Sequence, residues 1–196
     1  MRTRIILIES ILAVALVTTA CGAGSAATSG HGKTKVVAAF YPLAYAAEQI
    51  GAALHRPAAT ERFVARLAAV DREYRHGLAH CARRDIITSH QAFGYLGQRY
   101  HLTQVAITGL SPETEATPQD LEHVIAVAKK THATTVFFES LVSPRLADTV
   151  ARESGAKTAV LNPIEGLTKS RQAEGETYFS LMRDNLVALR RALGCR

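Results

Sequence analysis

Short apolar or β-branched segments alternate with helix-like segments along most of this 196-residue chain. Few hairpin signals lie between the strand-like segments. We expect strands at residues 35–40, 85–88, 104–107, 134–138 and 159–161, and helices at 43–50, 93–100, 118–130, 144–154 and 178–193. This alternation predicts an α/β fold, with a mostly parallel sheet that carries helices on both faces.

The helix starts can be placed from residues that favour the first helical turn. Thr117 and Pro118 predict the start of the helix over 118–130, because threonine caps a helix and proline suits its first position. A longer helix is expected over residues 57–84, with Thr60 as its N-cap. Apolar residues recur along one face of that helix (Phe63, Leu67, Val70, Tyr74, Leu78).

Polar residues follow some of the predicted strands at the point where each strand ends. They are His90, Glu139 and Asn162. Ligands of parallel α/β sheets bind at the carboxyl ends of the strands, and a neutral histidine there is a good metal ligand. The alternative for His90 is an ordinary histidine that is hydrogen-bonded in a turn. Other histidines are weaker candidates, although His76 and His80 lie four residues apart on the long helix.

The N-terminus has the pattern of an export signal. Arg2 and Arg4 precede an apolar run over residues 5–17, and small residues lead to Cys21. This pattern predicts a signal peptide over 1–20 and lipidation at Cys21, followed by a small, flexible tether over 21–34. The protein is then expected outside the cytoplasm, anchored to the cell membrane by lipid. Ordinary secretion, with Cys21 incidental, is the alternative.

Cysteine count and charge limit the remaining possibilities. If Cys21 is lipidated, Cys81 and Cys195 remain, and an even pair in an oxidising compartment predicts a disulfide. Two free thiols are the alternative. The formal net charge is +6, but the basic residues are scattered and no nucleic-acid-binding motif accompanies them. We therefore expect no nucleic-acid partner.

Several segments resemble, in the same order, a family of zinc/manganese-binding lipoproteins that serve ABC importers. They are residues 36–45 (VVAAFYPLAY), 88–96 (TSHQAFGYL), 109–113 (GLSPE), 136–139 (VFFE) and 161–167 (LNPIEGL). Members of this family have two α/β lobes joined by one rigid helix, bind one Zn²⁺ or Mn²⁺ between the lobes and deliver it to a membrane permease. The resemblance implies a remnant of the N-terminal lobe at 35–56, the linker helix at 57–84 and a C-terminal metal-binding lobe at 85–196. His90 would be a metal ligand, with Asn162 and Glu139 as minor contributors and the metal as cargo.

The chain departs from this family in one long stretch. The family carries further residues, including two histidine ligands, where Gly51 here runs almost directly into the long helix. Asn162 also stands where some members have a carboxylate ligand, and a neutral amide is a poorer ligand. We therefore expect weakened metal binding, and marginal stability or self-association. The alternative is a non-binding remnant or structural lipoprotein. An enzyme that uses Ser89 and His90 is not indicated, because no nucleophile motif accompanies them.

Overall fold

The computed structural model describes residues 45–46, 49, 57–110, 114–140 and 143–196. The predicted signal peptide, the tether and the strand at 35–40 lie outside these residues. Of the helix predicted over 43–50, the described residues Tyr45, Ala46 and Gln49 are helical.

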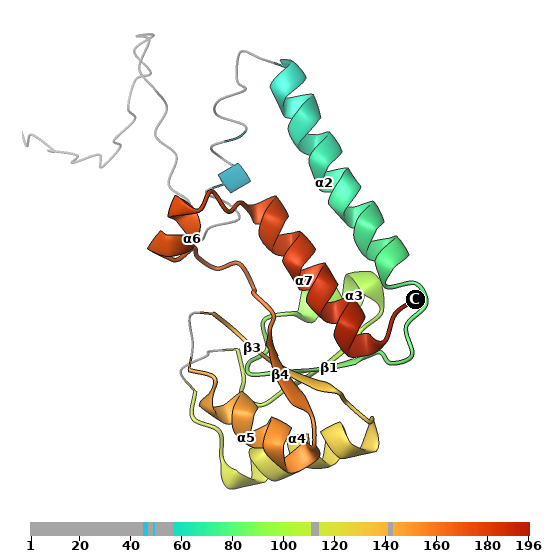
Figure 1. Cartoon of the computed structure of the whole chain (residues 1–196), viewed down its shortest axis with the longest axis vertical. Coiled ribbons are helices and arrows are strands. Elements are labelled where there is room, and N and C mark those ends of the chain that lie inside the picture. The colour runs from blue at the N-terminus through green and yellow to red at the C-terminus, as the bar shows by residue number, and fades with distance from the viewer. Residues whose placement is uncertain (1–44, 47–48, 50–56, 111–113, 141–142) are drawn as a thin grey trace, which may run out of the picture. The chain divides into compact units, whose positions relative to one another are not determined.

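A four-stranded parallel sheet forms the centre of the fold, with strand order β2-β1-β3-β4. The strands are β1 (Asp85–Thr88), β2 (Thr103–Ala106), β3 (Thr135–Phe138) and β4 (Lys157–Val160). The helices are α2 (Pro57–Gly77), α3 (Gly94–Tyr100), α4 (Pro118–Lys130), α5 (Arg145–Ser154), α6 (Lys169–Ala173) and α7 (Tyr178–Leu193). Figure 1 shows α4 and α5 on one face of the sheet, and α3 and α7 on the other. The predicted fold class is therefore confirmed.

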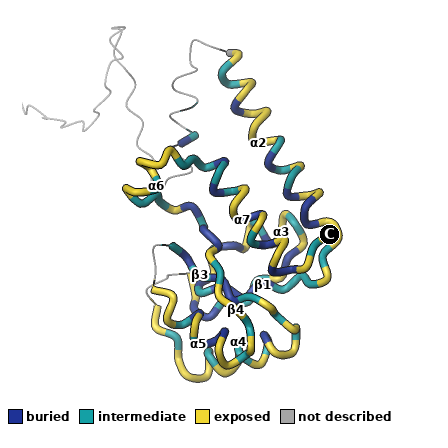
Figure 2. Tube along the Cα trace, in the orientation of Figure 1, coloured by how far each residue is buried: buried dark blue, intermediate teal, exposed yellow. Residues whose placement is uncertain are grey.

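Adjacent residues of the central strands supply two separate apolar cores, because successive side chains of a strand point to opposite faces. Ile86 and Phe137 pack with α2, α3 and α7. Ile87 and Val136 pack with α4 and α5. All four side chains are buried (Figure 2). Helices therefore pack on both faces of the sheet.

Helix α2 begins at the predicted residue 57, but its end and its predicted N-cap differ from the structure. It begins at Pro57, so Thr60 lies inside the first turn and is not the N-cap. It ends at Gly77, before the predicted end at residue 84. A Cβ on Gly77 would lie 3.2 Å from a methyl group of Leu186, so glycine lets α2 end close against α7.

The buried face of α2 packs against α7. Phe63, Val70 and Tyr74 are buried as predicted, whereas Leu67 is 38% exposed. The hydroxyl of Tyr74 donates a hydrogen bond of 2.7 Å to the carbonyl of Met182 on α7. This contact joins the long helix to the last helix of the chain.

Several other helix ends follow the local sequence signals. Thr117 and Asp120 form a reciprocal capping box at the start of α4, with Pro118 at the first helical position. Gly155 ends α5 in the left-handed conformation, at φ 78°. Helix α7 has the predicted bounds, whereas the short helix α6 was not predicted.

The C-terminus is attached to the segment that follows α2. Cys81 and Cys195 form the predicted disulfide across a sequence separation of 114 residues. The amide of Arg196 donates to the carbonyl of His80, and the amide of Arg83 donates to the carbonyl of Leu193. The end of α7 is therefore fixed beside the residues that lead into β1.

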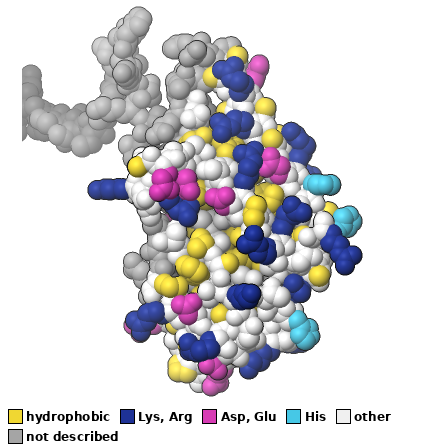
Figure 3. Space-filling model, viewed as in Figure 1, with side chains coloured by type: hydrophobic (Ala, Val, Ile, Leu, Met, Phe, Trp, Pro, Cys, Tyr) yellow, Lys and Arg dark blue, Asp and Glu magenta, His cyan; other side chains and the backbone are white. Residues whose placement is uncertain are grey.

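Lys and Arg side chains are spread over the face shown in Figure 3 and do not gather in one patch. Among the described residues, no helix combines the length and the apolar composition that a membrane crossing requires.

Candidate metal centre

The three polar residues predicted at strand ends are all buried at the carboxyl edge of the sheet. His90 follows β1, Glu139 follows β3 and Asn162 follows β4, and these strands are neighbours. Their exposed fractions are 1%, 4% and 5%. Buried polar groups at this edge need partners, and those partners separate the roles of the three residues.

The backbone of His90 is held by side chains of β1 and β2. The hydroxyl of Thr88 donates to the carbonyl of His90 at 2.9 Å. The side-chain amide (Nε2) of Gln104 donates to the same carbonyl at 2.9 Å and to the Thr88 hydroxyl at 2.8 Å. The imidazole thus projects from a fixed backbone.

The imidazole of His90 lies between two carboxylates. Its Nδ1 contacts Oε1 of Glu139, and its Nε2 lies 4.0 Å from Oε1 of Glu165. Among the described residues, Nε2 of His90 is buried and has no hydrogen-bond partner. A distance of 4.0 Å is too long for a direct hydrogen bond, so Glu165 does not satisfy this nitrogen.

Burial sets the protonation state of this group. Burial lowers the pKa of His90, and the negative charge of Glu165 opposes that shift. Burial, with a smaller contribution from Glu165, raises the pKa of Glu139 to about 7, and a hydrogen bond from Ser89 opposes it. His90 is therefore neutral at physiological pH, which is the form that binds metal ions.

Glu165 is the site residue that the sequence analysis missed. It lies in the segment 161–167 that carried part of the resemblance, three residues after Asn162. Ile164, between them, has a positive φ of 64°, which turns the chain so that Glu165 faces His90. The Glu165 side chain is 55% exposed, so its carboxylate can still move.

Asn162 supports the loop and does not face His90. Its backbone amide donates to Oδ1 of Asn185 at 2.8 Å, and its backbone carbonyl accepts from Nδ2 of Asn185 at 2.6 Å. Its side-chain oxygen accepts from the amide of Ile164 at 2.8 Å, and its side-chain nitrogen donates to Ser140. These bonds engage the whole amide group in positioning the loop that carries Glu165.

A pocket of about 830 Å³ opens in front of His90 and Glu165, and we call it the His90 pocket. It is lined by His90, Gln91, Ala92, Gly94, Tyr95, Gln98, Leu110, Pro163 and Glu165. None of these residues is lysine or arginine, so the lining suits a cation. Within the described part of the chain, no group of three or more His, Cys, Asp or Glu residues is placed to hold one metal ion.

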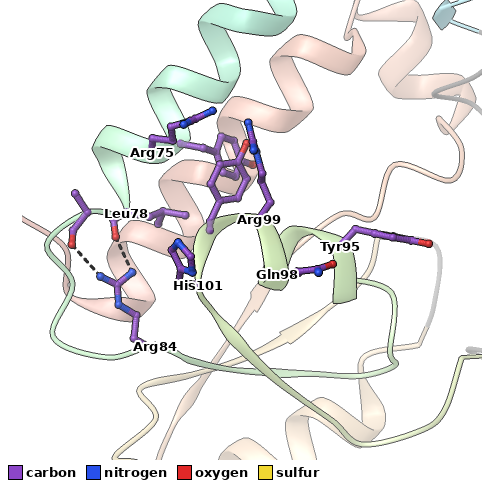
Figure 4. Close-up of a pocket in the computed structure, with 10 residues that line it drawn as sticks. Arg75, Leu78, Arg84, Tyr95, Gln98, Arg99 and His101 are labelled. Atoms are coloured by element: carbon purple, nitrogen blue, oxygen red, sulfur yellow. Dashed lines mark hydrogen bonds between the residues drawn. The ribbon is translucent and has the colours of Figure 1, made fainter.

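A second pocket, of about 850 Å³, has the opposite character (Figure 4). Arg75, Arg84, Arg99 and His101 line it, and its described lining includes no Asp or Glu. Arg84 donates to the carbonyls of Leu78 and Ala79, as the dashed lines of Figure 4 show. This pocket does not suit a metal cation.

The parallel sheet, the covering helices and the His–carboxylate pair at the strand ends together define an α/β lobe of the solute-binding-protein type. Residues 55–192 match the family described as zinc-uptake complex component A, periplasmic, and the chain belongs to that family. Proteins of this family serve as substrate-binding components of transporters and are not enzymes.

Individual relatives support the same assignment. The high-affinity zinc uptake system protein ZnuA of Bacillus subtilis (strain 168) is 40% identical over 134 residues, which are 68% of this chain and 42% of the relative. The zinc-binding lipoprotein AdcA of Streptococcus pneumoniae serotype 4 is 41% identical over 128 residues, which are 65% of this chain and 26% of the relative. The chain therefore spans less than half the length of these curated relatives.

A solved structure shows the same fold. The Zn(II)-bound ZnuA-like domain of Streptococcus pneumoniae AdcA is 34% identical and superposes with a TM-score of 0.60. The match covers 74% of this chain and 57% of that domain.

Proposed function

We propose that this chain acts as the metal-binding lobe of an extracytoplasmic solute-binding lipoprotein, with Zn²⁺ or Mn²⁺ as cargo for an ABC importer. One observation carries the proposal: the buried Nε2 of His90 has no hydrogen-bond partner among the described residues and faces the carboxylate of Glu165 across a cation-compatible pocket. The names of the relatives, which include zinc uptake and zinc-binding proteins, favour zinc over manganese.

The separation between His90 and Glu165 suits one shared ion. Zn–N and Zn–O bonds of about 2.0–2.2 Å allow two ligand atoms to lie at most about 4.3 Å apart, and about 3.4 Å apart in a tetrahedral site. The observed 4.0 Å lies within that limit. Because the side chain of Glu165 is half-exposed, a small rotation brings its carboxylate to the tetrahedral spacing.

Glu139 would hold the imidazole in the metal-binding form. A carboxylate against Nδ1 keeps the proton on that nitrogen and leaves the lone pair of Nε2 directed at the ion. The contact between Nδ1 and Oε1 of Glu139 places the carboxyl group where this role requires it. Glu139 is thus proposed as an orienting residue and not as a ligand.

The affinity is expected to be weaker than that of a complete zinc site. Zinc prefers four ligands, and His90 and Glu165 supply two from the described residues. A non-binding or structural lipoprotein is the competing function. The metal-binding function requires that zinc binds through His90, and the structural function does not.

Calorimetric titration of the full chain with zinc chloride tests the proposal. We expect saturable binding that weakens at least about tenfold in His90→Ala and in Glu165→Gln. The structure places His76 at the end of α2 but His80 after it, so the predicted four-residue helical spacing of these two histidines is not formed. The double variant His76→Ala/His80→Ala, which removes both exposed side chains, serves as the control and should bind like the wild type. Absence of saturable binding would favour the structural lipoprotein, and equal binding by His90→Ala would refute the assigned site.

The proposed location depends on Cys21. We propose removal of residues 1–20, acylation of Cys21 and a tether over 21–34, with a membrane permease as partner. The lipoprotein name of the AdcA relative supports this arrangement. Mass spectrometry of the N-terminal peptide from exporting cells should detect a diacylglyceryl-modified Cys21, and an unmodified cysteine would contradict it.

A further inference from the structure

We infer that zinc joins two copies of this chain, with His90 and Glu165 of each copy completing one shared four-ligand site. This inference rests on the proposed function of the same residues. It adds a partner, a second copy of the chain, and a stoichiometry of one zinc per two chains.

The ligand count motivates the inference. A closed zinc site has four ligands, commonly in tetrahedral arrangement. From the described residues, one chain places one imidazole and one carboxylate on the pocket, which is half of such a set. A twofold axis through the ion would supply the other half from identical residues, because an interface of this symmetry brings each residue opposite its equivalent.

The rim of the His90 pocket has the composition of an interface. Tyr95 is 93% exposed and Leu110 is 80% exposed, and both line the pocket beside His90 and Glu165. Figure 4 shows Tyr95 projecting away from the other labelled side chains. Gly94 leaves space beside it, since a Cβ there would meet no atom within 4 Å. Exposed aromatic residues around a polar centre are characteristic of binding surfaces.

Electrostatics make the association dependent on the ion. Among the described residues, the pocket lining carries the Glu165 carboxylate and no lysine or arginine. Two copies that face each other through this pocket would bring two carboxylates together, and like charges repel. A divalent cation between them reverses that repulsion. The chain should therefore be monomeric in chelator and dimeric with zinc.

Sedimentation velocity of the full chain, in EDTA and in zinc chloride, tests the inference. We expect a zinc-dependent doubling of the mass, saturation at one zinc per two chains and reversal by EDTA. His90→Ala and Glu165→Gln should abolish the doubling. Tyr95→Ser leaves the ligands in place and should weaken dimerisation about tenfold.

The double variant His76→Ala/His80→Ala excludes a different bridge, because these two exposed histidines near the end of α2 could bind zinc between chains. It should dimerise like the wild type, and loss of dimerisation in it alone would overturn the inference. One-to-one binding by a monomer that needs His90 would also overturn it, while leaving the proposed function intact. No zinc binding at all would refute the proposed function and the inference together.

Discussion

The reciprocal bonds between Asn162 and Asn185 should control both the stability of the domain and the position of Glu165. Asn185 on α7 accepts from the backbone amide of Asn162 at 2.8 Å and donates to its carbonyl at 2.6 Å. Both residues are buried. The substitution Asn185→Leu is close in shape, excludes water and removes both bonds.

The magnitude follows from the groups left without partners. Each buried backbone group that loses its hydrogen bond costs about 1–3 kcal/mol. Two such groups, partly offset by the added apolar side chain, give an expected loss of about 2–4 kcal/mol in the free energy of unfolding. Because the freed loop carries Glu165, the zinc affinity should also fall about tenfold or more.

Urea denaturation and zinc calorimetry of the same preparations provide the assay. Asp184→Leu is the matched control, since Asp184 is exposed on the adjacent position of α7 and its replacement should change stability by no more than about 0.5 kcal/mol. An unchanged urea midpoint in Asn185→Leu would refute the energetic argument. A lowered midpoint with unchanged zinc affinity would refute the link between this pair and Glu165.

Three further predictions concern the metal centre, the disulfide and an exposed ion cluster. Glu139→Gln should weaken zinc binding about 10–100-fold in calorimetry, whereas a purely structural Glu139 would leave the affinity unchanged. The double variant Cys81→Ser/Cys195→Ser should lose up to about 5 kcal/mol in urea denaturation, as expected for a crosslink between residues 114 positions apart, and a loss below about 1 kcal/mol would contradict this. The hydrogen bond from Arg75 lowers the pKa of Asp71, so the stability that Asp71 contributes is present above about pH 4 and is lost as the pH falls through its folded pKa. In urea denaturation from about pH 5 to about pH 3, the midpoint of Asp71→Asn should therefore fall less steeply than that of the wild type. An equally steep fall would contradict this prediction.

The order of strands and helices could be predicted because its signals are local. The N-cap residue Thr117 followed by Pro118, and the apolar period of residues 178–193, were sufficient to place α4 and α7. The N-cap predicted for α2 was wrong because two local signals compete at its start. Thr60 is a good N-cap, but Pro57 already has the backbone angle of a first helical residue.

The metal centre could be predicted only in part. Strand ends located His90 and Glu139, because parallel topology brings those ends to one edge of the sheet. The sequence predicted Asn162 and missed Glu165 because the positions of both depend on tertiary contacts and backbone angles that a sequence pattern does not show. Asn185 binds Asn162 from 23 residues further along the chain, and the positive φ of Ile164 redirects the loop.

The fold couples the two sides of the proposed centre through the C-terminal helix. His90 follows β1, which begins four residues after Cys81. The loop that carries Glu165 is hydrogen-bonded to Asn185 on α7, and α7 ends two residues before Cys195. The disulfide and the neighbouring backbone hydrogen bonds therefore hold the end of α7 beside the segment that leads into β1. Each chain contributes only two described ligands, so the affinity of the proposed site depends on how rigidly those ligands are held. The crosslink at the end of α7 is thus expected to matter for metal binding as well as for stability.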